Sequence, residues 1–200
     1  MSEKKRVVVA ISGASAPIYG IRMLEILGER EEVETHLVLT RSSMRVVQLE
    51  THRSLDDLRE LADEYYRWDD MAAAVSSGSF RHHGMVVAPC SINTMACIAQ
   101  SITKDLVTRA ADVTLKERRP LILMIRESPL HLGHLRQLTA LAEMGAVIAP
   151  PIPGFYYNPR SLQEMVDHSV GRALDLLDIH IDMKRWRTPE GGESPFGKAD

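Results

Sequence analysis

Short aliphatic runs, each followed by small, hydroxyl or charged residues, constrain the fold of this chain more than any other feature. VVVAI precedes Ser12-Gly13, GMVVA precedes Pro89-Cys90-Ser91, and LILMI precedes Arg126-Glu127. Such runs are typical of strands that are buried on both faces, as in parallel sheets. The stretches with helical spacing that alternate with them are 18–27, 105–118, 130–144 and 161–179. This order predicts an α/β fold: a mostly parallel sheet flanked by helices.

Other segments complete the predicted order. Two further strands are expected at 33–40 and 146–149, and a helix at 41–50. The charged segment 55–68 indicates another helix, or a helix with a loop. Gly145 is expected to end one helix, and Ser161 with Glu164 three residues later suits a capping box at the start of the next.

Composition limits the class of protein. The 200 residues fit one domain, which we place at 1–187, followed by a polar tail at 188–200. The formal net charge of −3 argues against nucleic-acid binding, which needs a basic surface. No apolar run approaches the roughly 20 residues of a membrane helix, and no signal peptide is recognisable, so we expect a cytoplasmic protein without a membrane partner.

The cysteines and histidines indicate no metal site. Cys90 and Cys97 are the two cysteines, and they suit a core in a reducing compartment. His131 and His134 have a spacing that suits ligands on a helix, but no third ligand is evident near them. The eight histidines as a whole follow no metal-binding pattern.

The ends of the predicted strands are the expected binding site, because ligands of open α/β sheets bind outside the carboxyl ends of the strands. That rule selects Gly13-Ala14-Ser15, Thr40-Arg41-Ser42, Pro89-Cys90-Ser91 and Arg126-Glu127. GASAPIYG lacks the second glycine of a dinucleotide fingerprint, so a pyrophosphate-binding turn is not expected. Hydroxyls gathered at one edge suit a phosphate monoester, although helix capping also explains any single one of them.

Several charged and aromatic residues are candidates for chemistry. Arg109, Arg126 and Arg172 lie on or beside apolar segments, so each is expected to meet an anion, either a ligand or a carboxylate such as that of Asp112. Glu127 directly follows a buried strand, and burial there would suit it to proton transfer. The tyrosines of the 154–159 loop suit either a pocket wall or an aromatic plug over the sheet.

Taken together, these segments resemble the UbiX-type flavin prenyltransferases, over roughly residues 7–186. The most specific stretch is DLVTRAADVTLKERRPLILMIRE at 105–127, supported by GASAPIYG, APCSINTMA, GAVIAPPIPGFYYNP and GRALD. The resemblance implies a Rossmann-like subunit in a homododecamer, with FMN bound between subunits. It also implies transfer of a dimethylallyl group from dimethylallyl monophosphate to flavin N5 and C6. The prenylated FMN then serves a UbiD-type decarboxylase.

The same resemblance assigns roles to residues. The implied catalytic residues are Ser15, Glu50 and Glu127. The implied cofactor-binding residues are Gly13, Ala14, Ser15, Thr40, Ser91, Thr94 and Arg109, with Ser77 or Ser79 close by. The implied ligands of the substrate phosphate are Lys116, Arg126, Tyr156 and Arg172. Trp186 matches a tryptophan that covers the site, some of these residues are expected from neighbouring subunits, and no metal is implied.

The chain departs from the family pattern at two places. Ala16 stands where the family usually has glycine, so the backbone of that turn is expected to differ slightly. Arg136 and Gln137 replace a glutamate and an asparagine, which affects the expected subunit contacts or pocket shape. Two alternatives remain open: an FMN-dependent decarboxylase of a cysteine-containing substrate, and a non-catalytic subunit that carries flavin for a decarboxylase.

Overall fold

The fold is built on a six-stranded parallel sheet. The computed structural model describes residues 4–186. The strands are β1 (Lys5–Ile11), β2 (Val33–Leu39), β3 (Glu64–Tyr66), β4 (Gly84–Cys90), β5 (Leu121–Ile125) and β6 (Val147–Ile148), and their order across the sheet is β3-β2-β1-β4-β5-β6. All neighbouring strands pair in parallel. The order changes direction between β1 and β4, which places the switch point at the carboxyl ends of those two strands.

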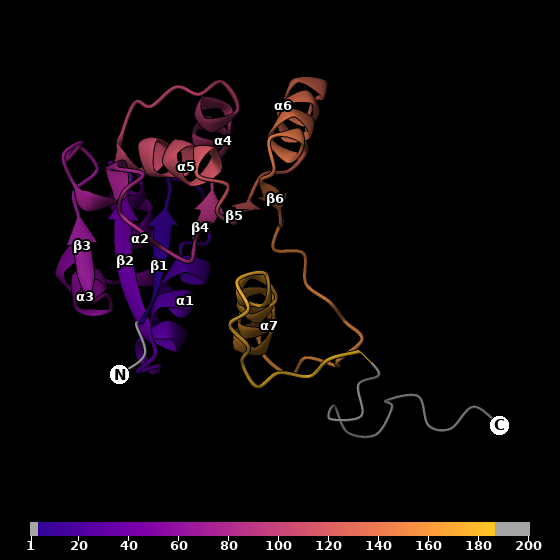
Figure 1. The fold of residues 1–200 in the computed structure, drawn as a ribbon. Coiled ribbons are helices and arrows are strands. Elements are labelled where there is room, and N and C mark those ends of the chain that lie inside the picture. The colour runs from indigo at the N-terminus through magenta and orange to yellow at the C-terminus, as the bar shows by residue number, and fades with distance from the viewer. Residues whose placement is uncertain (1–3, 187–200) are drawn as a thin grey trace.

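Helices cover both faces of the sheet (Figure 1). They are α1 (Ile18–Gly28), α2 (Ser43–Thr51), α3 (Leu55–Glu60), α4 (Ile92–Ala99), α5 (Leu106–Lys116), α6 (Leu132–Glu143) and α7 (Leu162–Asp175), with a 3-10 turn, η1, at Ala74–Ser76. Helices α1 and α7 contact each other on one face, and α4 contacts α5 and α6 on the other.

Alternation along β1 divides the core between these two layers. Val7, Val9 and Ile11 pack with α1 and α7, whereas Val8 and Ala10 pack with α4 and α5. All five are at most 1% exposed, as expected for a central parallel strand that is buried on both faces. The predicted α/β class is therefore confirmed.

Several helix boundaries match the prediction and others differ. Gly145 has φ +98°, the left-handed conformation that ends a helix, as predicted. The Ser161 hydroxyl accepts from the Glu164 N–H at 3.1 Å, but the Glu164 carboxylate accepts from the N–H of Arg160 instead of that of Ser161. The predicted capping box is thus only half formed. Helix α7 ends at Asp175, four residues earlier than predicted.

The segment 55–68 was predicted only in part. It forms the short helix α3 and then β3, which pairs with β2 at the edge of the sheet. Three residues are too few for a periodic signal, so the strand depends on pairing with His36–Val38 of β2. The predicted tail at 188–200 lies outside the described residues. Within residues 4–186, no helix is both long and apolar enough to span a membrane.

Candidate functional site

Ser12 connects the first two loops of the carboxyl edge. Its side chain is fully buried and donates to the Pro89 carbonyl at 2.7 Å, while its oxygen accepts from the Ser91 N–H at 2.7 Å. The backbone N–H of Ser12 also donates to the Pro89 carbonyl, at 3.2 Å. These bonds fix the β1–α1 loop against the start of α4, on either side of the switch point.

Glu50, from the last turn of α2, holds the β1–α1 loop from the other side. Its Oε2 accepts from the backbone N–H of Ala16 at 2.7 Å. Ala16 has φ +71°, the left-handed conformation that glycine adopts without steric cost. The turn therefore has a glycine-like backbone with alanine in it. Ser15 lies one residue from this bond and is half-buried.

The β2–α2 loop packs directly on the β1–α1 loop. A side chain at Gly13 would place its Cβ 2.2 Å from the Ser42 Oγ, so only glycine fits. The Ser42 hydroxyl lies 3.2 Å from the Thr40 Oγ1, and Thr40 is 4% exposed. Gly13, Thr40 and Ser42 thus lie together, as the sequence predicted.

The start of α4 adds two more hydroxyls. The Ser91 oxygen accepts from the Thr94 N–H at 3.2 Å, which confirms Ser91 as the cap, and its hydroxyl donates to the Thr94 Oγ1 at 3.1 Å. Both residues belong to a helix N-terminus at the carboxyl edge, where the helix dipole favours an anion.

Arg126 and Glu127 follow β5 at the same edge. The Arg126 N–H donates to the Cys90 carbonyl at 3.1 Å, which places it beside the start of α4. Glu127 is exposed, and its carboxylate accepts from the next residue, Ser128, at 2.9 Å. The burial that we expected for Glu127 is therefore not provided by its own chain.

Tyr156 and Arg172 line a cavity beside α7. The cavity has a volume of about 370 Å³, and its wall also includes Met124, Pro150 and His168. The Tyr156 hydroxyl lies 2.8 Å from the His168 Nε2. The sequence left two roles open for the tyrosines of the 154–159 loop, a pocket wall and an aromatic plug, and the structure shows one of each. Tyr156 lines a cavity, while Tyr157 is 7% exposed and belongs to the core.

Asp175 connects this cavity to the end of the described chain. Both of its oxygens bind Arg185, at 2.6 and 2.8 Å, and one also binds Arg172 at 2.7 Å. Burial opposes ionisation of Asp175, but the Arg185 bonds and its other partners prevail and lower its pKa from 3.8 to about 2. Trp186, the next residue, lies edge-on to Tyr156 with ring centroids 5.4 Å apart.

Two of the predicted site residues lie on α5. Arg109 donates to the Ser76 carbonyl at 3.1 Å and pairs with Asp112 at 3.0 Å. Lys116, at the other end of α5, pairs with Glu117 beside Gly78. Because α5 leads into β5, Lys116 lies toward the amino edge of the sheet. In a single chain, both residues therefore lie beside the 76–79 loop, with Arg109 in the first turn of α5 and Lys116 at the end of α5 that is farther from the carboxyl edge.

The residues at the carboxyl edge suit FMN. The Ser15, Thr40 and Ser42 hydroxyls and the N-terminus of α4 are donors of the kind that a phosphate monoester needs. Gly13 and Ala14 add no bulky side chain to that edge, which leaves an approach for a planar ring. Within residues 4–186, no group of three or more histidine, cysteine or acidic side chains is arranged to hold a metal.

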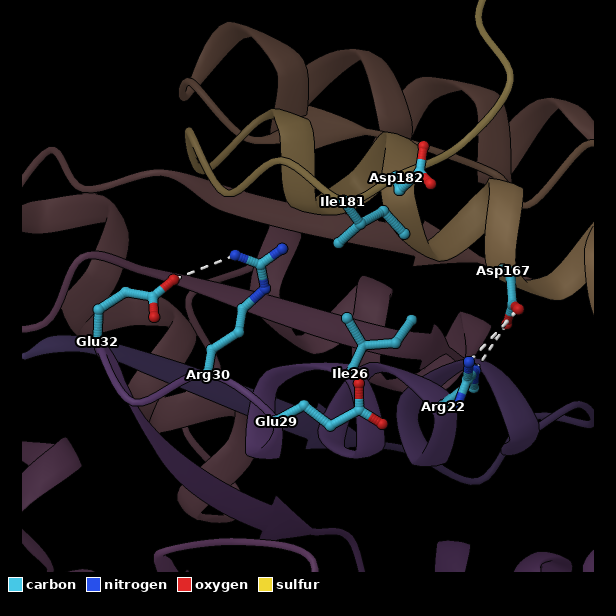
Figure 2. Close-up of a pocket in the computed structure, with 8 residues that line it drawn as sticks. All are labelled: Arg22, Ile26, Glu29, Arg30, Glu32, Asp167, Ile181 and Asp182. Carbon is cyan, nitrogen blue, oxygen red and sulfur yellow. Dashed lines mark hydrogen bonds and ion pairs between the residues drawn. The ribbon is translucent and has the colours of Figure 1, made fainter.

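A second hollow lies away from these loops, along α1 (Figure 2). Its volume is about 480 Å³ and its lining is mostly charged. Arg22 pairs with Asp167 at 2.7 Å, and Arg30 pairs with Glu32 at 3.1 Å. Its lining includes none of the predicted site residues, so the carboxyl edge remains the candidate site.

Sequence reasoning missed two residues that organise the site. Ser12 was treated only as the first residue of a turn, although its place directly after a buried run indicates a residue that faces other loops. His168 carried no signal, because a lone histidine within a helix matches no motif. Only the fold brings it to Tyr156.

Comparisons with known proteins agree with this geometry. A model of the family described as Flavoprotein matches residues 1–181. The flavin prenyltransferase UbiX of Salmonella typhimurium is 51% identical over 186 residues, which cover 92% of this chain and 98% of that protein. A structure of AnUbiX (PadA1) with FMN and dimethylallyl pyrophosphate is 44% identical, with a TM-score of 0.88, and covers 92% of this chain and 100% of that one. A dodecameric FMN-dependent UbiX-like decarboxylase from Escherichia coli O157:H7 is 41% identical, with a TM-score of 0.89 and the same coverage.

Proposed function

The chain belongs to the UbiX-type flavin prenyltransferase family, and we propose that it transfers a dimethylallyl group from dimethylallyl monophosphate to N5 and C6 of FMN. The observation that carries the proposal is the joined carboxyl edge, where Ser12 fixes two loops and Glu50 fixes the turn that holds Ser15. A flavin prenyltransferase needs such an edge, because the ring must be held in one orientation while the prenyl group is added.

The residues of this chain divide the work of the reaction. Bound FMN supplies the nucleophilic ring. Arg126, Tyr156 and Arg172, together with Lys116, hold the leaving phosphate and stabilise the charge that develops on it. Glu50 and Glu127 are the carboxylates that accept or return a proton at their Oε atoms as the ring closes. Ser15 orients the ring edge.

We also propose that each site is assembled from two or more copies of the chain. In one copy, Lys116 lies at the end of α5 toward the amino edge of the sheet, whereas Ser15 lies at the carboxyl edge. Exposed Glu127 would gain burial from a neighbouring copy. The dodecameric relative supports a homododecamer. Arg136 is exposed on α6, so its departure from the family pattern concerns contacts between copies.

The activity is tested by incubating the protein with reduced FMN and dimethylallyl monophosphate, without oxygen, and analysing the eluted flavin by mass spectrometry. The expected product is FMN plus one prenyl unit. A parallel reaction with dimethylallyl pyrophosphate, the ligand named for the AnUbiX structure, decides between the two phosphates. Unmodified flavin in both reactions would contradict the proposal. In a separate incubation with FMN and a cysteine-containing acid, loss of CO₂ from that acid would favour a decarboxylase.

The shared site is tested by mixing two inactive variants, Ser15→Ala and Lys116→Ala, in one assembly. If each site takes Ser15 from one copy and Lys116 from another, some mixed sites contain both native residues and activity returns. The two variants assembled separately are the controls. No return of activity in a verified mixed assembly would contradict a shared site.

The product and location follow from the same proposal. Prenylated FMN would serve a UbiD-type decarboxylase, with the transfer tested by adding the eluted flavin to the cofactor-free decarboxylase. A cytoplasmic location is proposed because FMN and the decarboxylase are both expected there. Residues 1–187 are proposed as the flavin-binding domain.

A further inference from the structure

His168 is a buried histidine on α7 that contacts two tyrosines of the 154–159 loop. It lies on the inner side of α7, is 8% exposed, and stacks on the Tyr157 ring with centroids 4.1 Å apart. Its Nε2 lies 2.8 Å from the Tyr156 hydroxyl oxygen. The Tyr157 stack fixes the plane of the imidazole, and so the direction from which it meets Tyr156.

The hydrogen bond between His168 and Tyr156 lies at the proposed site for the substrate phosphate. His168, Tyr156 and Arg172 line the same cavity of about 370 Å³. Tyr156 and Arg172 are proposed ligands of the substrate phosphate, so this inference rests on the proposed function. Any residue that decides where the Tyr156 proton points also decides whether Tyr156 donates to that phosphate.

The chemistry of the pair allows two arrangements. A phenol has a single proton. If the imidazole accepts that proton in a hydrogen bond, Tyr156 turns only lone pairs toward the phosphate, which an anion repels. If the imidazole instead donates from Nε2, Tyr156 accepts that bond and its own proton is free for a phosphate oxygen.

The charges that face His168 are on α7 and on the segment after it. Arg172 and Arg185 are cationic, and Asp175, bound to both, is anionic; the aromatic rings that contact the imidazole are those of Tyr156 and Tyr157. Burial lowers the pKa of His168. The positive charges of Arg172 and Arg185 lower this pKa further, and the negative charge of Asp175 opposes them. The imidazole is therefore mainly neutral near pH 7, and its tautomer decides the direction of the bond.

We propose that His168 is a positioning residue for Tyr156: it donates from Nε2 to the Tyr156 oxygen and so directs the Tyr156 hydroxyl proton onto the phosphate of the prenyl donor. A dianionic phosphate selects this tautomer, because only this one leaves Tyr156 a proton to donate. His168 itself does not touch the substrate. It acts on binding of the phosphate, through Tyr156.

The test is a set of variants assayed for KM of dimethylallyl monophosphate and for kcat. His168→Leu removes the donor and should raise KM about tenfold. His168→Gln keeps an N–H donor and should raise KM by less than about threefold. His168→Phe is a second replacement without a donor, should the leucine variant not fold.

A matched control is available in His83. Its Nε2 lies 2.8 Å from the Leu177 carbonyl, so it makes a hydrogen bond of the same length outside the cavity. His83→Leu should lower the melting temperature without changing KM. A rise in KM in this control equal to that of His168→Leu would overturn the proposal, because it would show a general loss of structure.

A double-mutant cycle isolates the route through Tyr156. In a Tyr156→Phe background, which has no hydroxyl to direct, His168→Leu should change KM by less than about twofold. An unchanged KM in His168→Leu alone, or an equal rise in both backgrounds, would overturn the proposal. If the native protein forms prenylated flavin, these outcomes concern His168 alone; if it forms none, the proposed function itself fails.

Discussion

Replacing Ala16 with glycine should stabilise the β1–α1 turn. Ala16 has φ +71° and its N–H is held by the Glu50 carboxylate at 2.7 Å, so the turn cannot relax to an ordinary conformation without losing that bond. A left-handed conformation costs an L-residue roughly 1–2 kcal/mol, and glycine avoids that cost. Ala16→Gly keeps the N–H and therefore keeps the bond.

The expected gain is smaller than the steric cost, because glycine also loses more backbone entropy on folding, roughly 0.5–1 kcal/mol. The net increase in the free energy of unfolding is about 0.5–1 kcal/mol. For a chain of this size, that corresponds to a rise in melting temperature of about 1–4 °C.

Thermal unfolding of the two proteins at one fixed concentration measures the difference. Ala14→Gly is the matched control, because Ala14 lies in the same turn without a positive φ and should lose stability on the same substitution. If Ala16→Gly lowers the melting temperature as much as Ala14→Gly does, the reasoning about strain at Ala16 is refuted.

Three further predictions concern buried polar groups. Ser12→Ala leaves the Ser91 N–H without its partner, so urea unfolding should show a loss of about 2 kcal/mol, with weaker FMN binding by fluorescence titration; an unchanged stability would contradict this role. Burial, with help from Arg119, lowers the pKa of His82 from 6.5 to about 4. As the pH falls, His82 is therefore protonated in the unfolded chain before it is protonated in the folded one, and the free energy of unfolding should fall by up to about 3 kcal/mol between pH 6.5 and pH 4. If His82→Leu does not reduce this pH dependence, His82 is not its source. Asp175→Asn removes a charge that binds Arg185 through both oxygens, so trypsin should cleave after Arg185 faster than in the native protein, and an equal rate would contradict the proposed restraint.

The carboxyl edge was predictable because it depends on a general rule. The sequence predicted five of the six strands, and the rule that ligands bind at their carboxyl ends selected Ser15, Thr40 and Ser91. The structure brings the loops that hold these three residues together through Ser12 and Glu50. Motif resemblance added the roles, which remain proposals for this chain.

Other features were not predictable from the sequence. Strand β3 has three residues and depends on pairing with β2, so it leaves no periodic signal. The bond between His168 and Tyr156 joins a helix to an irregular loop, and no spacing rule relates the two. The exposure of Glu127 differs from expectation because the sequence shows the buried strand before it but not the solvent beyond it.

The central claim is that the joined loops at the carboxyl edge hold FMN while a prenyl group is added to it. The most direct measurement is the mass spectrum of flavin eluted after anaerobic turnover, for the native protein and for Ser15→Ala. The native protein should yield a flavin that carries one prenyl unit, and the variant should lose most of that product. Equal amounts of prenylated flavin from both proteins would contradict it.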